Sequence, residues 1–114
     1  MNNLIEIKNL SKNYFNQKKI NVLKNLNYKF KSGKIYSLVG PSGSGKSTLL
    51  NILALIDRPS NGKLVIDNHK INFDEININD SLRSNKFGII YQEKNLLPDF
   101  TALENVSLAG IANG

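Results

Sequence analysis

The sequence contains no cysteine, which excludes disulfide bonds and thiolate metal sites and agrees with a reducing compartment. It also contains no apolar run near the roughly 18 residues that a membrane-spanning helix needs. The start, MNNLIEIKNL, lacks the basic and then apolar order of a secretory signal peptide. We therefore expect a protein that stays in the cytosol.

Arginine is scarce, so the formal charge of +6 comes mostly from lysines spread between Lys8 and Lys94. These lysines form no tight cluster and are not interleaved with aromatics, which favours a solvated surface over a nucleic-acid interface. Attraction to an anionic nucleotide, membrane or nucleic acid is the alternative. With 114 residues, 40% apolar and 21% charged, the composition is typical of one globular domain over residues 1–114.

The first third of the chain has the pattern of an antiparallel sheet. Residues 4–10 and 23–30 alternate apolar and polar side chains, which predicts two half-buried strands. Residues 11–19 are interpreted as a polar connection between them, and residues 31–34 as a tight turn.

An α/β pattern follows. Residues 35–39 predict a buried strand that feeds a glycine-rich loop, and residues 47–56 predict a helix that is buried on most sides. Residues 62–67 and 87–91 read as further strands, and residues 79–85 as a short helix. Finally, Thr101 and Glu104 form a capping box that predicts a helix through about Leu108.

The loop between the predicted buried strand and helix, Gly40-x-x-x-x-Gly45-Lys46-Ser47, fits the P-loop pattern. Gly43 and Gly45 have no side chains to block phosphate oxygens, so consecutive N–H groups can point inward beside the helix N-terminus. The predicted phosphate-binding residues are Gly40, Pro41, Ser42, Gly43, Ser44, Gly45, Lys46, Ser47 and Thr48.

Three side chains of this loop have predicted roles toward ATP and Mg²⁺. Lys46 would reach the β- and γ-phosphates, and Ser47 would ligate Mg²⁺ through its hydroxyl. Thr48 would hydrogen-bond the α-phosphate. A glycine- and serine-rich turn that happens to end in Lys-Ser-Thr is the alternative, which the flanking buried strand and helix argue against.

The sequence LVGPSGSGKSTLLNILALIDRPSNGKLVIDN, followed by FGIIYQEKNLLPDFTALENVSLAG, resembles the ATP-binding subunits of ABC transporters. Within that family it is most similar to the lipoprotein-releasing and macrolide-efflux exporters. The resemblance implies a P-loop NTPase-like α/β fold, here an antiparallel β subdomain plus part of the nucleotide-binding core, truncated to the N-terminal half. It also implies that the partners are membrane permease subunits and a second ATP-binding subunit, and that nucleic acid is not a partner. The implied location is the cytoplasmic face of the inner membrane.

The resemblance also assigns two residues outside the loop. Gln92 matches the Q-loop glutamine, which would ligate Mg²⁺ or orient the attacking water; a polar strand-end residue is the alternative. Tyr14 matches the aromatic residue that stacks on adenine, although neighbouring Phe15 could take that role.

Residues 1–114 contain no LSGGQ-type signature, no Walker B strand and no switch histidine. By chain order His69 is not the switch histidine and is interpreted as a turn residue. Neither Asp99 nor Glu104 follows a hydrophobic strand, so Asp99 is interpreted as a loop residue and Glu104 as a helix cap. Positioning and charge stabilisation dominate phosphoryl transfer, and the missing segments would supply much of both. We therefore expect this chain to bind ATP without efficient hydrolysis.

Whether it is part of a hydrolysing subunit or a non-hydrolytic nucleotide-binding fragment stays open. A P-loop kinase is disfavoured because its lid would need more arginines than Arg58 and Arg83.

Overall fold

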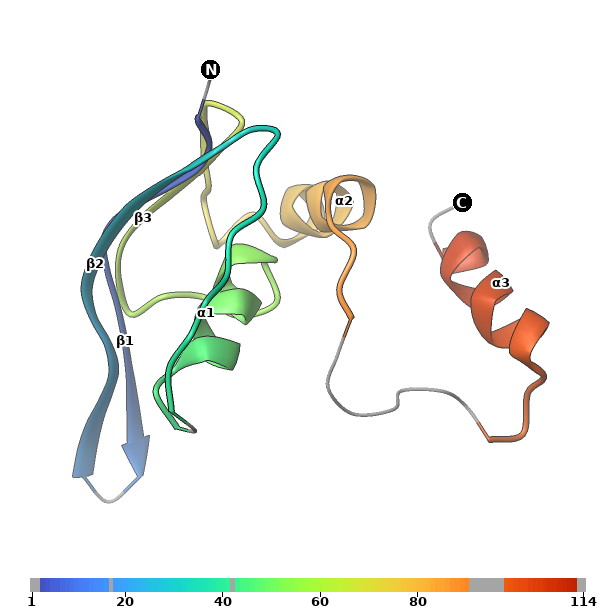
Figure 1. The fold of residues 1–114 in the computed structure, drawn as a ribbon, viewed down its shortest axis with the longest axis horizontal. Coiled ribbons are helices and arrows are strands. Elements are labelled where there is room, and N and C mark those ends of the chain that lie inside the picture. The colour runs from blue at the N-terminus through green and yellow to red at the C-terminus, as the bar shows by residue number, and fades with distance from the viewer. Residues whose placement is uncertain (1–2, 17, 42, 91–97, 113–114) are drawn as a thin grey trace.

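Four strands and three helices are present among the residues that the computed structural model describes, which are 3–16, 18–41, 43–90 and 98–112. In chain order they are β1 (Asn3–Asn16), β2 (Lys18–Lys31), α1 (Lys46–Leu53), β3 (Asn61–Ile66), β4 (His69–Lys70), α2 (Ile76–Lys86) and α3 (Ala102–Ala112). The strands form one antiparallel sheet in the order β2-β1-β3-β4. Figure 1 shows these strands curving along one side of α1.

The β1–β2 hairpin is longer than the sequence pattern predicts. The expected polar connection over residues 11–19 is wrong, because pairing continues past Tyr14↔Ile20 to Asn16↔Lys18. In this part of the hairpin many side chains lie in water, so strand pairing there does not require the apolar alternation that marks a half-buried strand. The hairpin therefore carries Tyr14 on a strand rather than on a loop.

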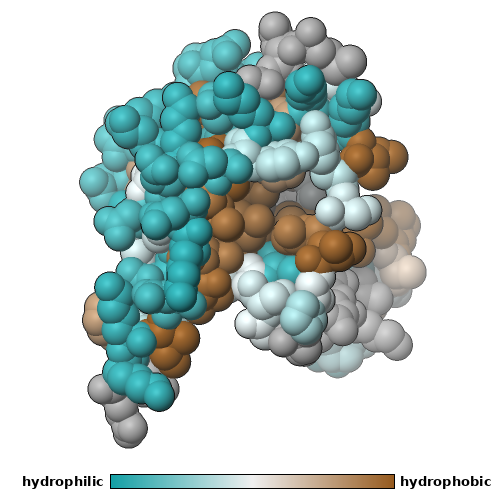
Figure 2. All heavy atoms as spheres, turned by 60° about the vertical axis from the view of Figure 1, so that its left-hand side comes forward, coloured by the Kyte–Doolittle hydropathy of each residue, from teal (hydrophilic) through white to brown (hydrophobic). Residues whose placement is uncertain are grey.

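The core lies between the sheet and α1. Leu10 of β1, Ile52 of α1 and Leu64 of β3 are fully buried, and each stabilises the fold by about 1.5–3 kcal/mol relative to an exposed side chain. The other face of the sheet carries exposed lysines, including the cross-strand pair Lys8↔Lys63. Figure 2 shows hydrophilic side chains spread over the outside of the sheet, with apolar side chains gathered along its inner edge.

Gly62 lets β3 lie directly against β1. Its φ angle is 101°, and an added Cβ would lie 2.4 Å from the carbonyl oxygen of Asn9. A side chain is therefore excluded here both by the left-handed backbone and by the neighbouring strand.

Helix α1 agrees with the predicted helix but is buried on fewer sides. Leu49 and Ile52 pack into the core, whereas Leu50 is 55% exposed. The helix also ends at Leu53, earlier than the predicted end at residue 56. The sheet covers one side of α1, and within the described residues no second layer covers the other.

Two predicted core strands are not formed. Residues 35–39 have no regular structure, with Ile35 99% exposed, and neither do residues 87–90. A parallel strand is stable only beside hydrogen-bonding neighbours, and no strand within the described ranges pairs with either segment. Residue 91, the last of the second predicted strand, lies outside the described residues.

The later elements are local and were predicted more closely. The predicted strand 62–67 corresponds to β3, and helix 79–85 lies within the longer α2. The interpretation of His69 as a turn residue is wrong, because it follows the turn and pairs with Ile66 as the first residue of the short strand β4. Its Nδ1 lies 2.8 Å from the carbonyl oxygen of Asp67. None of the described helices is long and apolar enough to cross a bilayer.

The capping box before α3 is confirmed. The N–H of Thr101 donates to Glu104 Oε1 at 3.0 Å, and the N–H of Glu104 donates to Thr101 Oγ1 at 3.1 Å. The backbone and side chain of Thr101 lower the pKa of the Glu104 carboxyl. Glu104 is therefore a helix cap, as its spacing predicts.

Candidate nucleotide-binding site

The glycine-rich loop curls tightly before α1. Gly43 has φ 81° and Gly45 has φ 94°, both in the left-handed region that favours glycine. A Cβ on Gly45 would lie 2.9 Å from Leu23 Cδ2 and 3.0 Å from Val22 Cγ1, so β2 packs directly against this residue. The hairpin thereby fixes the end of the loop and the start of the helix.

The beginning of the loop is also closely packed. The N–H of Ser44 donates to the Pro41 carbonyl at 3.1 Å, and a Cβ on Gly40 would lie 2.7 Å from Ser44 Oγ. Glycine at position 40 therefore leaves room for the Ser44 hydroxyl. Ser42, a predicted loop residue, lies outside the described residues.

Lys46 folds back over the loop that it follows. Its Nζ donates to the carbonyl oxygen of Gly40 and, at 3.4 Å, to that of Pro41. Within the described residues no carboxylate pairs with Lys46. The ammonium therefore lies inside the loop, with its charge available to an anion.

The N-terminus of α1 faces the same loop. Its N-cap is Gly45, which supplies no side-chain hydrogen bond, and the first turn contains no acidic residue. The first N–H groups of the helix and its positive dipole end are thus left for an anion. Ser47 is exposed and Thr48 is half-buried in this first turn. Their roles as Mg²⁺ ligand and α-phosphate donor stay predictions.

A cavity of about 400 Å³ lies between the loop and β2. Residues 44–46 line one side of it, and residues 21–24 line the other. Leu23 is the cross-strand partner of Lys12, and Tyr14 lies two residues further along β1. The strand that carries Tyr14 is therefore the hydrogen-bonded neighbour of the strand that lines this cavity, and the Tyr14 ring itself does not line it.

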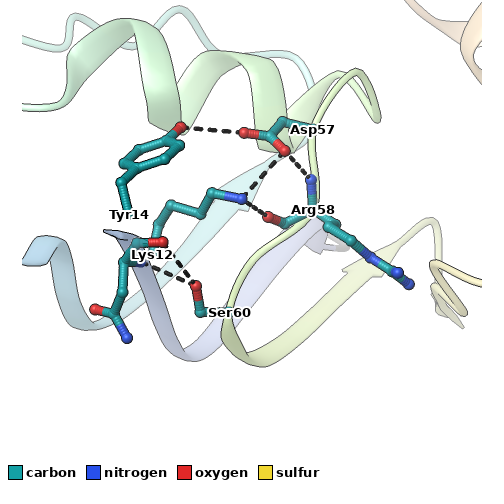
Figure 3. Close-up of polar contacts among 6 residues, drawn as sticks. Lys12, Tyr14, Asp57, Arg58 and Ser60 are labelled. Carbon is teal, nitrogen blue, oxygen red and sulfur yellow. Dashed lines mark hydrogen bonds and ion pairs between the residues drawn. The ribbon is translucent and has the colours of Figure 1, made fainter. Parts of the chain in front are cut away.

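Tyr14 belongs to a polar network at the end of α1 (Figure 3). Its hydroxyl donates to Asp57 Oδ2 at 3.2 Å, while Lys12 Nζ donates to Asp57 Oδ1 at 3.2 Å and to the Arg58 carbonyl at 2.6 Å. The same Nζ lies 5.1 Å from the centroid of the Tyr14 ring, within cation–π range. Neither Lys12 nor Asp57 was predicted as a site residue, since 45 positions separate them.

The carboxyl of Asp57 is held in its ionised form. Partial burial acts to raise its pKa, but the N–H of Arg58, the Lys12 ammonium and the Tyr14 hydroxyl outweigh that effect. The pKa of Asp57 is therefore lowered from its ordinary value of 3.8.

The remaining candidates are less informative. Gln92 lies outside the described residues, so its roles at the metal and in catalysis stay predictions. The described residues contain no group of three or more His, Asp or Glu that could hold a metal ion. The role of Ser47 as a Mg²⁺ ligand likewise stays a prediction.

An antiparallel sheet packed on a helix that follows a glycine-rich loop defines part of a P-loop NTPase fold. The chain belongs to the ABC transporter family, whose model matches residues 23–113. This result confirms the family resemblance carried by the loop and by the segment from Phe87 onward.

The relatives include two kinds of bacterial transporter protein. The lipoprotein-releasing system ATP-binding protein LolD of Rickettsia bellii is 43% identical over 114 residues, which are 99% of this chain and 49% of LolD. The macrolide export ATP-binding/permease protein MacB of Mannheimia succiniciproducens is 42% identical over 114 residues, or 98% of this chain and 18% of MacB.

A solved relative is the ATP-binding cassette MJ0796 of Methanocaldococcus jannaschii, in a dimeric post-hydrolysis state bound to ADP and Pi. It matches with a TM-score of 0.88 and 42% identity, covering 96% of this chain and 48% of that structure. The chain thus spans about half the length of LolD and of MJ0796.

Proposed function

We propose that the chain binds ATP with Mg²⁺ at the loop that precedes α1. The observation that carries this proposal is the position of Lys46, whose ammonium lies within the loop beside an uncapped helix N-terminus. This arrangement puts one full and one partial positive charge at the same place, as a triphosphate requires. The dimeric MJ0796 structure bound to ADP and Pi supports the choice of an adenine nucleotide.

Each side chain has a separate task in this proposal. The loop N–H groups and Lys46 hold the β- and γ-phosphates, Ser47 ligates Mg²⁺, and Thr48 donates to the α-phosphate. Tyr14 stacks on adenine. Gln92 completes the metal site or orients the attacking water.

For the whole protein we propose the ATP-binding subunit of an ABC exporter. Its partners are membrane permease subunits and a second ATP-binding subunit, and it lies on the cytoplasmic face of the inner membrane. The similarity to LolD and MacB supports lipoprotein release or export as the process that it energises. Hydrolysis requires the signature, Walker B and switch segments, none of which occurs within residues 1–114.

Calorimetric titration of MgATP into the chain tests the binding proposal. One saturable site per chain is expected, and the absence of saturable heat would contradict it. Phosphate release measured over a range of chain concentrations then tests the second alternative, a non-hydrolytic nucleotide-binding fragment. ATP binding without phosphate release at any concentration agrees with this alternative, whereas release that grows with chain concentration excludes it.

A further inference from the structure

The segment that follows α1 fixes the aromatic ring of Tyr14. We propose that Lys12 and Asp57 are positioning residues that hold this ring as a platform for the base of the bound nucleotide. This inference rests on the proposed function, because it assigns the means by which the base is recognised at that site. It concerns two residues that do not contact the phosphates.

The Asp57 carboxylate accepts hydrogen bonds from two residues of β1 and from one residue of its own segment. Oδ2 accepts from the Tyr14 hydroxyl, and Oδ1 accepts from Lys12 and from the N–H of Arg58 at 2.8 Å. Figure 3 shows the tyrosine and the lysine reaching the carboxylate from the same side. A charged acceptor binds such donors more strongly than a neutral one, so the ring is held at its outer end.

Lys12 holds the ring from a second direction. Its side chain is only 12% exposed, and its ammonium lies 5.1 Å from the centroid of the Tyr14 ring. Asp57 pairs with this ammonium at 3.2 Å, so the largely buried charge beside the ring is compensated. Tyr14 nevertheless remains 41% exposed, which leaves ring surface for a planar ligand.

The segment that holds Tyr14 is itself anchored to α1. The N–H of Asp57 donates to the carbonyl of Asn51 at 3.2 Å, at the end of the helix whose first residue is Lys46. One short helix therefore joins the phosphate loop at its start to the tyrosine anchor just beyond its end. The ring and the loop are thus both attached to α1, and preorganisation of this kind favours binding.

Ser60 extends the anchor along β1 on the N-terminal side of the ring. The N–H of Asn13 donates to Ser60 Oγ at 2.9 Å, and the N–H of Ser60 donates to the carbonyl of Ser11 at 2.8 Å. Both neighbours precede Tyr14 in the strand. The backbone that carries the ring is thus fixed as well as its hydroxyl.

The contacts that hold the ring distinguish Tyr14 from its neighbour Phe15. Phe15 is 79% exposed, and within the described residues no ring contact holds it. Ordering a free ring on binding costs side-chain entropy, which the ring of Tyr14 has already lost on folding. Tyr14 is therefore the better platform of the two.

Two ligands separate a positioning role from a general structural one. MgATP uses both the loop and the ring, whereas magnesium tripolyphosphate uses the loop alone. We expect Tyr14→Phe, Asp57→Asn and Lys12→Met each to weaken MgATP binding about two- to tenfold, in line with the loss of one or two hydrogen bonds. Tripolyphosphate affinity should stay unchanged in all three variants.

Two matched controls are Tyr28→Phe on β2 and Asp67→Asn. The Asp67 carboxylate lies 3.8 Å from Lys86 Nζ and, in the described part of the chain, has no contact with the Tyr14 network. Both should bind MgATP as the unmodified chain does. Equal losses for MgATP and tripolyphosphate in the three test variants would overturn the inference, and so would unchanged MgATP affinity. If the unmodified chain bound neither ligand, the proposed function itself would fail, which is a distinguishable result.

Discussion

Gly45 and Leu23 are in direct contact at the point where the β1–β2 hairpin meets the phosphate loop. A single Cβ on Gly45 would lie 2.9 Å from the Leu23 side chain and 3.2 Å from the Val22 carbonyl oxygen. Gly45 is also the N-cap of α1, with φ 94°. This one glycine therefore sets both the helix start and the distance of the loop from the sheet.

Replacing Gly45 by alanine should destabilise the chain by about 1–3 kcal/mol, because the new Cβ meets β2 and the residue must keep a left-handed backbone. Urea unfolding followed by circular dichroism measures this change. Gly88→Ala is the matched control, since no atom lies within 4 Å of its added Cβ and its φ lies outside the left-handed region. Equal midpoints for the two variants would contradict the packing described for Gly45.

The Asp57 network should make stability depend on pH. Its pKa is lowered on folding, so its contribution is present above the unfolded value near 3.8 and is lost as the pH falls through the lower folded value. Asp57→Asn should therefore destabilise the chain at pH 7, and the difference from the unmodified chain should shrink toward pH 3.

Unfolding in urea at pH 7 and pH 3 tests this dependence, with Tyr28→Phe, which removes no carboxyl group, as the control. A gap between Asp57→Asn and the unmodified chain that stays constant with pH would show that the carboxylate is not stabilised by Lys12 and Tyr14 in its charged form.

The capping box at α3 should be needed for that helix. Thr101→Ala removes the hydroxyl that accepts the Glu104 N–H and should reduce helix stability by about 0.5–2 kcal/mol. Amide hydrogen exchange of α3 measures the loss directly. Ser107→Ala, an exposed substitution further along the same helix, should leave exchange nearly unchanged. Similar protection in both variants would argue against the cap.

Local features could be predicted from the sequence, because neighbouring residues alone determine them. The P-loop spacing identified the segment that forms the loop before α1, and Thr101 with Glu104 identified the start of α3. The prediction of a strand over residues 35–39 is wrong, because neighbouring residues alone do not determine a strand of this kind. It forms only when distant strands pair with it.

The network around Tyr14 could not be predicted from spacing. Lys12 and Asp57 meet only because β1 lies beside the end of α1, and 45 positions separate them in the chain. The polar composition of residues 11–19 also indicated a connection where the structure has a paired strand. A recognisable signal was the interval of two between Lys12 and Tyr14, which puts both side chains on one face of a strand.

The central claim is that Lys46 holds the phosphates of a bound nucleotide. Calorimetric titration of MgATP into Lys46→Ala, beside the exposed-residue control Lys34→Ala, tests it most directly. Losing a charge-assisted contact to phosphate should weaken MgATP binding by at least about tenfold, so we expect an affinity reduced by that factor or more for Lys46→Ala and normal affinity for Lys34→Ala. Equal MgATP affinity in the two variants would contradict the proposed function.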